Sequence, residues 1–147
     1  MPITFTASAR SNDIVRGTAD SDILFGDDGD DAMNGAAGND LLVGGGGDDR
    51  IHGGDGNDLL IGGSGADTFS FSGFGGTIGR DYVLDFAPDE GDALNFSFVD
   101  GINDVEDVLD AAIQDGRNTV IDTDEGEIVI VNFDVSDLTA DMMSVFG

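Results

Sequence analysis

The sequence predicts an all-β fold: a parallel β-roll, a right-handed solenoid of short strands, followed by a β-rich C-terminal cap that contains one short helix. Two observations predict it. From Gly17 to Ser70 one nine-residue phrase occurs six times without a break, as GTADSDILF, GDDGDDAMN, GAAGNDLLV, GGGGDDRIH, GGDGNDLLI and GGSGADTFS. After residue 70 the period stops and Phe becomes frequent. We therefore expect an N-terminal strand and degenerate copy over 1–16, the roll over 17–70 and the cap over 71–147.

Three positions of the nine-residue phrase are constant in kind. Position 1 is always Gly, position 6 is always Asp, and position 8 is always large and apolar. Gly at positions 1, 2 and 4 permits turn conformations that are closed to other residues, and a single inward-facing apolar residue between two others is typical of a short strand. Each phrase therefore predicts a turn of six residues and a strand of three. Two phrases make one coil of eighteen residues, so each phrase stacks on the next but one.

This stacking would bring the position-6 carboxylates together in two columns. Strands lie roughly 4.8 Å apart, and two like charges at that separation repel by about 3.5 kcal/mol at a dielectric constant of ~20. Ca²⁺ accepts about six oxygen ligands, which two carboxylates and several carbonyls can supply. We therefore expect four Ca²⁺ sites, at the pairs Asp22–Asp40, Asp40–Asp58, Asp31–Asp49 and Asp49–Asp67.

A degenerate copy upstream would add a fifth site. Residues 8–16 lack the glycines but keep Asp13 at position 6 and Val15 at position 8. Downstream, position 6 of the next phrase in register falls on Gly76. We therefore expect the column of aspartates to end before Gly76.

The phrases resemble the GGxGxDxUx nonapeptide of the RTX (repeats-in-toxin) proteins. The resemblance implies a parallel β-roll that binds calcium through position-6 carboxylates and backbone oxygens of positions 1 to 4. Residues 17–22 match the pattern least, because Asp20 replaces Gly at position 4 and Thr18 stands at position 2, where the next two copies have Asp27 and Ala36. The implied metal residues are Asp13, Asp22, Asp31, Asp40, Asp49, Asp58, Asp67, Gly26, Gly29, Gly35, Gly38, Gly44, Gly45, Gly47, Gly53, Gly54, Gly56, Gly62, Gly63 and Gly65.

Composition supports a metal-dependent fold and excludes some partners. The formal net charge is -26, from 31 acidic and 5 basic residues, and there is no Cys. Such a chain repels nucleic acid and anionic membrane surfaces, and no apolar run approaches the ~18 residues of a membrane span. Without disulfides, a segment this rich in Gly and Asp needs another source of stability, for which a metal is the natural candidate.

The C-terminal part has the features of a cap. Alternating runs begin at Asp81 and Asp92, a helical face includes Val105, Val108, Leu109, Ala112 and Ile113 with Gly116 as its stop, and the runs 118–123 and 127–133 predict a hairpin. The region is similar to the segment that follows the roll in RTX proteins exported by type I secretion, as in DYVLDF and LTADMMSVF. The resemblance implies a secreted protein whose last residues interact with the type I machinery as an uncleaved signal. Segment 134–147 can also be read as a final docking strand or helix, and the two interpretations are compatible.

The sequence predicts that this chain has no catalytic centre and is not an enzyme. The single His, His52, stands at position 9 of a repeat, and no Cys or Lys is present, so no base is available for a nucleophilic triad. An EF-hand is also excluded, because its loop needs Glu at the twelfth position and the first Glu of the chain is Glu90.

Three functions remain from these observations. The first is a module that folds when it binds calcium outside the cell. The second is a carbohydrate-binding module, similar to the RTX modules of alginate-modifying epimerases. A cluster of arginines on one face would favour it and scattered arginines would count against it; the five are Arg10, Arg16, Arg50, Arg80 and Arg117. The third is an acidic mimic of nucleic acid, which the strict nine-residue period makes unnecessary.

Overall fold

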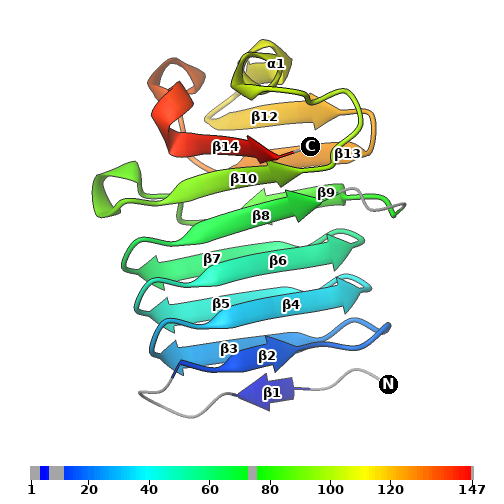
Figure 1. The fold of residues 1–147 in the computed structure, drawn as a ribbon, viewed down its shortest axis with the longest axis vertical. Coiled ribbons are helices and arrows are strands. Elements are labelled where there is room, and N and C mark those ends of the chain that lie inside the picture. Colours follow the sequence, from blue (N-terminus) through cyan, green and yellow to red (C-terminus); the bar gives the residue numbers. More distant parts are fainter. Residues whose placement is uncertain (1–3, 7–11, 73–75, 147) are drawn as a thin grey trace.

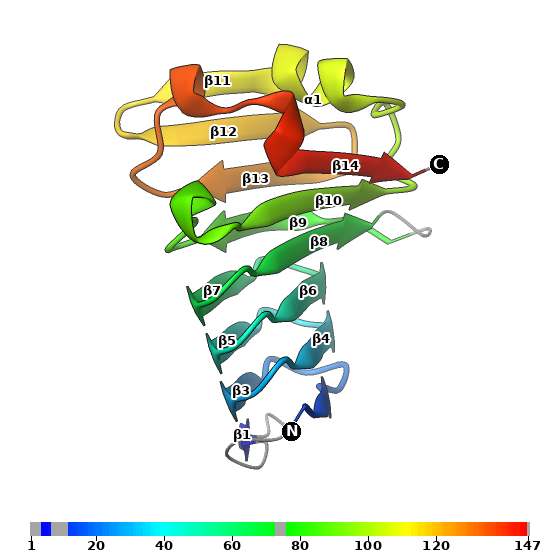
Figure 2. The same cartoon turned by 60° about the vertical axis from the view of Figure 1, so that its left-hand side comes forward.

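The computed structural model describes residues 4–6, 12–72 and 76–146. Two sheets lie face to face and run the length of the molecule, with the N-terminal strand at one end and the helix and the last strands at the other (Figure 1). Turned by 60°, the molecule is narrow at the roll and wider at the cap (Figure 2). This is the predicted parallel β-roll with a β-rich cap.

From β1 to β10 the strands alternate between the two sheets, and β11 to β13 then all join the larger one. The eight-stranded sheet contains, in spatial order, β1 (Thr4–Thr6), β3 (Ile23–Asp28), β5 (Leu41–Gly46), β7 (Leu59–Ser64), β9 (Gly79–Val83), β13 (Gly126–Ile130), β12 (Asn118–Thr123) and β11 (Ala112–Asp115). The six-stranded sheet contains β14 (Met143–Phe146), β10 (Ala93–Ser97), β8 (Thr68–Ser72), β6 (Arg50–Asp55), β4 (Ala32–Ala37) and β2 (Ile14–Arg16). The helices are α1 (Val105–Ala111) and the 3₁₀ turns η1 (Pro88–Glu90), η2 (Val135–Asp137) and η3 (Ala140–Met142).

The eighteen-residue register of the roll is the predicted one. In parallel pairing, Leu24 lies opposite Leu42 and Leu42 opposite Leu60, while Met33 pairs with Ile51 and Ile51 with Phe69 in the other sheet. The position-8 side chains of the six phrases are at most 3 % exposed. They form the core between the two sheets, because the central residue of each x-U-x triplet points inward.

The repeat strands are twice as long as predicted. Strands β3 to β7 each span six residues, from position 7 of one phrase to position 3 of the next. The prediction of a six-residue turn was therefore wrong, and only positions 4 to 6 lie outside the strands. The physical reason is that positions 1 to 3 also pair with the adjacent coils, as in the pairing of Asp27 with Gly45.

The cap continues the stack of the roll. Strand β9 pairs in parallel with β7 and β10 with β8, and then β13 adds to β9 and β14 to β10. The predicted hairpin is present as β12 and β13. Edge-to-face contacts of Phe86 with Phe69 and with Phe133, at centroid distances of 6.2 and 5.3 Å, join the core of the roll to that of the cap.

The predicted helix is shorter in the structure. Helix α1 ends at Ala111, and Ala112 and Ile113 belong to β11 instead. Ile113 is 57 % exposed, and Gly116, with φ of 64°, forms the tight turn between β11 and β12 rather than a helix stop. Across the described ranges, no helix is long and apolar enough to cross a membrane.

Candidate metal sites in the stacked turns

The position-6 aspartates form two hydrogen-bonded columns, one at each edge of the roll. In each column the backbone N–H of one Asp donates to Oδ1 of the Asp in the following coil. The bonds run from Asp22 to Asp40 and on to Asp58, at 2.7 and 2.8 Å, and from Asp13 to Asp31, Asp49 and Asp67, at 2.7, 2.8 and 2.9 Å. All four expected pairs are therefore adjacent in the structure, as is the upstream pair with Asp13. Residues 8–11 of the degenerate copy lie outside the described residues.

The second carboxylate oxygen of these residues has a different environment. In five aspartates Oδ2 is buried and accepts no hydrogen bond: Asp31, Asp40, Asp49, Asp58 and Asp67. These residues are at most 2 % exposed. A buried ionised carboxylate without a partner is costly, so it is expected to be paired with a cation, to coordinate a metal or to be protonated.

The position-1 glycines mark the space in front of each Oδ2. A Cβ added to Gly44 would overlap Oδ2 of Asp49 and lie 2.7 Å from the carbonyl oxygen of Gly62, in the next coil. Gly26 and Gly35 face the corresponding carboxylate and carbonyl oxygens, and Gly53 and Gly62 face Oδ2 of Asp58 and Asp67. A carboxylate oxygen of one coil and a carbonyl oxygen of the next thus face the same small space.

The glycines of positions 2 and 4 carry carbonyl groups in line along the stack. They have left-handed backbone conformations, with φ between 105° and 132°: Gly45, Gly54 and Gly63 at position 2, and Gly29, Gly38, Gly47, Gly56 and Gly65 at position 4. A Cβ on Gly45, Gly54, Gly63, Gly47, Gly56 or Gly65 would overlap the carbonyl oxygen of the same position in the preceding coil. This close approach and the positive φ together explain the preference for Gly.

Burial shapes the electrostatics of the columns. Desolvation raises the pKa of Asp40, Asp49 and Asp67 to about 6, and neighbouring carboxylates add to the shift. The pKa values of Asp31 and Asp58 are raised for the same main reason. At neutral pH the columns therefore hold negative charge that the fold disfavours, and a divalent cation would relieve it.

The donor set fits a hard cation. Within the described part of the chain, no three His, Cys, Asp or Glu side chains converge on one point, so a site here would combine carboxylates with backbone carbonyls. Such all-oxygen sets suit Ca²⁺. The sequence matches the family model of the RTX calcium-binding nonapeptide repeat (4 copies) over residues 10–42, 34–69 and 43–78. Residues 10–78 therefore carry RTX calcium-binding repeats.

Solved structures agree with this assignment. The RTX roll and cap are similar to the extracellular lipase LipA from Serratia marcescens, with a TM-score of 0.65 and 26% identity over 94% of this chain. The chain spans only 20% of the lipase. The solution structure of the AlgE6R2 subunit of the Azotobacter vinelandii mannuronan C5-epimerase matches with a TM-score of 0.64 and 29% identity, over 89% of this chain and 91% of that subunit. No curated protein sequence matches the chain.

The first RTX phrase differs from the others at Oδ2 of its position-6 aspartate. Oδ2 of Asp22 accepts hydrogen bonds from the backbone N–H and the hydroxyl of Thr18, at 2.6 and 2.9 Å. Thr18 occupies position 2, where the last three phrases have Gly. The protein itself therefore supplies the partners that Oδ2 lacks in the five buried aspartates.

The two columns also extend further than predicted. Asp58 N–H donates to Oδ1 of Asp81, and Asp67 N–H to Oδ1 of Asp92, each at 2.9 Å. The expectation that the column ends before Gly76 was therefore wrong. The sequence separations are 23 and 25 residues instead of 18, so insertions of five and seven residues hide the register.

A sequence signal for these two residues exists. Residues 76–84, GTIGRDYVL, keep Gly at positions 1 and 4, Asp81 at position 6 and Val83 at position 8. Asp92 and Leu94 keep only positions 6 and 8. A search for the phrase that allows a short insertion between copies would find both.

Proposed function

We propose that this chain is a calcium-binding RTX module that folds around Ca²⁺ after type I secretion. One observation carries the proposal: five buried Oδ2 atoms, in register along two columns, have no hydrogen-bond donor. Each faces a position-1 glycine, whose missing side chain leaves room for an ion. When bound, Ca²⁺ would neutralise these carboxylates and take carbonyl oxygens as further ligands.

Different groups of the chain would supply the charge, the neutral ligands and the space of each calcium site. The position-6 aspartates supply charge, the carbonyl groups of positions 1, 2 and 4 supply neutral ligands, and the glycines keep side chains out of the space. We propose three of the expected pairs as sites on this geometry: Asp31–Asp49, Asp40–Asp58 and Asp49–Asp67. The pair Asp22–Asp40 fits less well because Thr18 already partners Asp22.

If folding requires bound calcium, the chain can stay unfolded during export and fold afterwards. At a free calcium concentration about 100-fold above its dissociation constant, each site stabilises the folded state by about 2.7 kcal/mol. With a net charge of -26, the chain would resist compaction in a compartment with little calcium. It would then fold outside the cell, with residues 17–70 as the roll, 71–147 as the cap and the segment 134–147 as the export signal.

Calcium-dependent folding is tested by far-UV circular dichroism of the full chain with calcium and with a chelator. We expect strand content to rise with calcium and to fall again on chelation, with Mg²⁺ at the same concentration as the control for ionic strength. Equal strand content in both conditions would refute the proposal. A transport assay with and without residues 134–147 tests the export signal separately.

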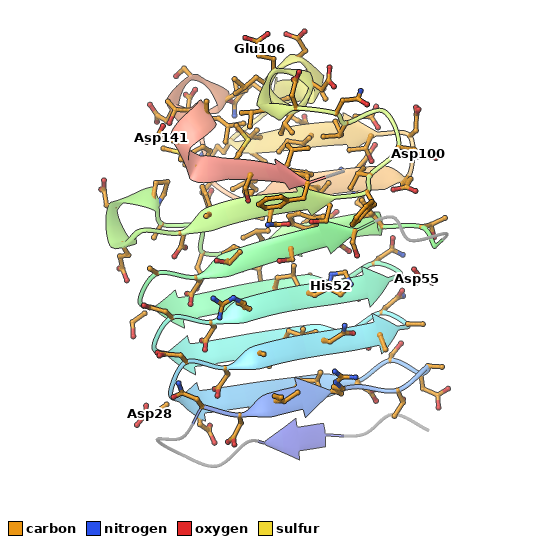
Figure 3. The ribbon with its side chains drawn as sticks, in the orientation of Figure 1. Asp28, His52, Asp55, Asp100, Glu106 and Asp141 are labelled. Atoms are coloured by element: carbon orange, nitrogen blue, oxygen red, sulfur yellow. The ribbon has the colours of Figure 1, made fainter. Side chains whose placement is uncertain are left out.

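A carbohydrate-binding role is the second candidate. Similarity to nearly the whole AlgE6R2 subunit, part of a mannuronan epimerase, supports it. Arg16 and Arg50 line a hollow of about 210 Å³ on the outer face of the six-stranded sheet, together with His52, which Figure 3 places on that face. Arg80 instead pairs with Glu127 at 3.0 Å, and Arg10 lies outside the described residues.

Binding to an alginate-type polysaccharide tests this second candidate. We expect the folded, calcium-loaded chain to bind the anionic polymer and the double variant Arg16→Gln/Arg50→Gln to lose that binding, while Arg117→Gln keeps it. Arg117 lines a different hollow, in the cap. Equal binding by both variants would exclude this surface.

A further inference from the structure

We propose that calcium binding continues beyond the six phrases, at a site between Asp58 of the roll and Asp81 of the cap. This inference rests on the proposed calcium function. Asp58 is fully buried, and its Oδ2 has no hydrogen-bond donor. Asp81 is 1 % exposed and lies outside the residues that the RTX model matches.

The step from Asp58 to Asp81 repeats the geometry of the steps inside the roll. Asp58 N–H donates to Oδ1 of Asp81 at 2.9 Å, compared with 2.8 Å from Asp40 to Asp58. Strand β9 pairs with β7 through Tyr82 opposite Leu59 and Val83 opposite Leu60, which places Asp81 level with Asp58. The side chain that accepts this N–H thus comes from a strand of the cap.

The backbone at positions 4 and 5 also follows the repeat, whereas Gly76 at position 1 faces the carboxylate of Asp55 instead of that of Asp81. Gly79 has a left-handed φ of 78°, and a Cβ there would overlap the carbonyl oxygen of Gly56, as a Cβ on Gly56 would overlap that of Gly38. Arg80 N–H donates to Oδ1 of Asn57 at 2.8 Å, as Asn57 N–H donates to Oδ1 of Asn39 at 3.0 Å. Positions 4, 5 and 6 of the repeat are therefore reproduced in the cap.

Asp81 is the last carboxylate of its column. In the following coil Ile128 of β13 pairs with Asp81, and its side chain is fully buried. The column of aspartates therefore closes on an apolar residue at this position. An ion at the Asp58–Asp81 step would be the final one at this edge and would join β7 to β9.

The consequence is that calcium would hold the cap onto the roll as well as order the roll. The two parts share aromatic contacts through Phe86, but on this edge the described residues of β7 and β9 pair at two positions, Leu59 with Tyr82 and Leu60 with Val83. Without the ion, Asp58 and Asp81 are two buried carboxylates: desolvation raises the pKa of both, and the charge of Asp58 raises the pKa of Asp81 further. Attachment of the cap at this edge would then depend on calcium.

The test is a count of bound calcium ions in the full chain. Asp81→Asn keeps an oxygen that can accept the Asp58 N–H but removes the charge. We expect it to bind one ion fewer than the wild type in native mass spectrometry. The matched control is Asp122→Asn, which removes one charge from an exposed residue of the cap and should bind as many ions as the wild type.

A local signal separates cap attachment from folding of the roll. Tyr82 is the only Tyr and there is no Trp, so near-UV circular dichroism near the Tyr band reports this junction. In Asp81→Asn the calcium midpoint of that signal should rise by about tenfold, the expected loss for one charged ligand. The far-UV midpoint should shift less.

Four outcomes decide the proposal. An unchanged ion count and Tyr82 midpoint in Asp81→Asn would overturn it, while a wild type that binds no calcium would refute the proposed function itself. If Asp81→Asn fails to fold, crystals of the wild type grown with Tb³⁺ give the answer. An anomalous peak between Asp58 and Asp81 supports the site, and its absence beside occupied sites in the roll overturns it.

Discussion

Gly44 faces the carboxylate of Asp49 so closely that a side chain on residue 44 would overlap Oδ2. The backbone of Gly44 is not left-handed, in contrast to Gly45 and Gly47 in the same phrase. Gly is therefore required at position 1 for space, whereas positions 2 and 4 also require the conformation. The space in question is the one proposed for the ion.

Substitution of Gly44 by Ala should therefore damage the calcium site. Overpacking of this kind costs about 1–3 kcal/mol, so we expect isothermal titration calorimetry to show weaker calcium binding. Gly46→Ala is the control, because a Cβ there would meet only Ser64 Oγ at 3.5 Å and Asp28 Oδ1 at 3.6 Å, which are ordinary contacts. Equal affinity in the two variants would argue against an ion beside Gly44.

Replacement of Asp49 by Asn should have opposite effects with and without calcium. Asn keeps an oxygen for the N–H of Asp31 and removes a buried charge whose pKa is raised to about 6. The calcium-free chain should then be more stable at pH 8 and the calcium-loaded chain less stable, as measured by thermal melts in chelator and in calcium. The control is Asp48→Asn, at an exposed neighbouring position. It should change neither the calcium-free nor the calcium-loaded stability by a comparable amount.

Low pH should stabilise the calcium-free folded state in part, because protonation neutralises the buried carboxylates that calcium would otherwise neutralise. Desolvation raises the pKa of Asp40, Asp49 and Asp67 to about 6 and that of Asp81 to about 8, against about 3.9 in an unfolded chain. Between these values the calcium-free folded state binds more protons than the unfolded state, so the free energy of unfolding falls as pH rises. We expect urea melts without calcium to give higher stability at pH 5 than at pH 8.

General charge repulsion would give the same trend, and salt distinguishes the two causes. In 1 M NaCl the Debye length is about 3 Å, which screens exposed charges far more than buried ones. The difference between pH 5 and pH 8 should therefore persist in high salt, and it should narrow in Asp81→Asn. If the difference in stability between pH 5 and pH 8 disappears in high salt, repulsion between surface charges is its cause instead.

Ala36 should be replaceable by Gly with a gain in stability. It occupies position 2 with a left-handed φ of 82°, a conformation that costs an L-residue roughly 1–2 kcal/mol. Ala36→Gly should raise the melting temperature in calcium. Ala37→Gly is the control: its backbone is not left-handed, so Gly there should lower stability by about 0.5–1 kcal/mol.

Much of the fold and site follows from the nine-residue period. Because each coil holds eighteen residues, the period alone predicts that Leu24, Leu42 and Leu60 stack in one sheet and that Asp40 lies beside Asp58. It also predicts that these carboxylates need a counter-charge. The period does not show that positions 1 to 3 extend the strands, since a run of glycines carries no strand signal of its own.

The part of the site that the sequence did not predict lies where the period is interrupted. Residues 71–75 displace the next copy by five positions, so Asp81 falls out of the numerical register but not out of the spatial one. The helix prediction failed at Ala112 for a different reason. Its apolar residues fit a helical face, but pairing of Ala112 with Ile121 in the sheet takes precedence.

The turns are joined by hydrogen bonds that run in opposite directions at neighbouring positions. At position 6 the N–H donates forward, from Asp40 to Asp58, and at position 5 it donates backward, from Asn57 to Asn39. Each coil therefore supplies acceptors to the coil before it and the coil after it, and loss of one coil leaves both neighbours with unsatisfied donors. Such mutual dependence should make the response to calcium cooperative: we expect the roll to order over a narrow range of concentration, as a single switch rather than as a series of independent sites.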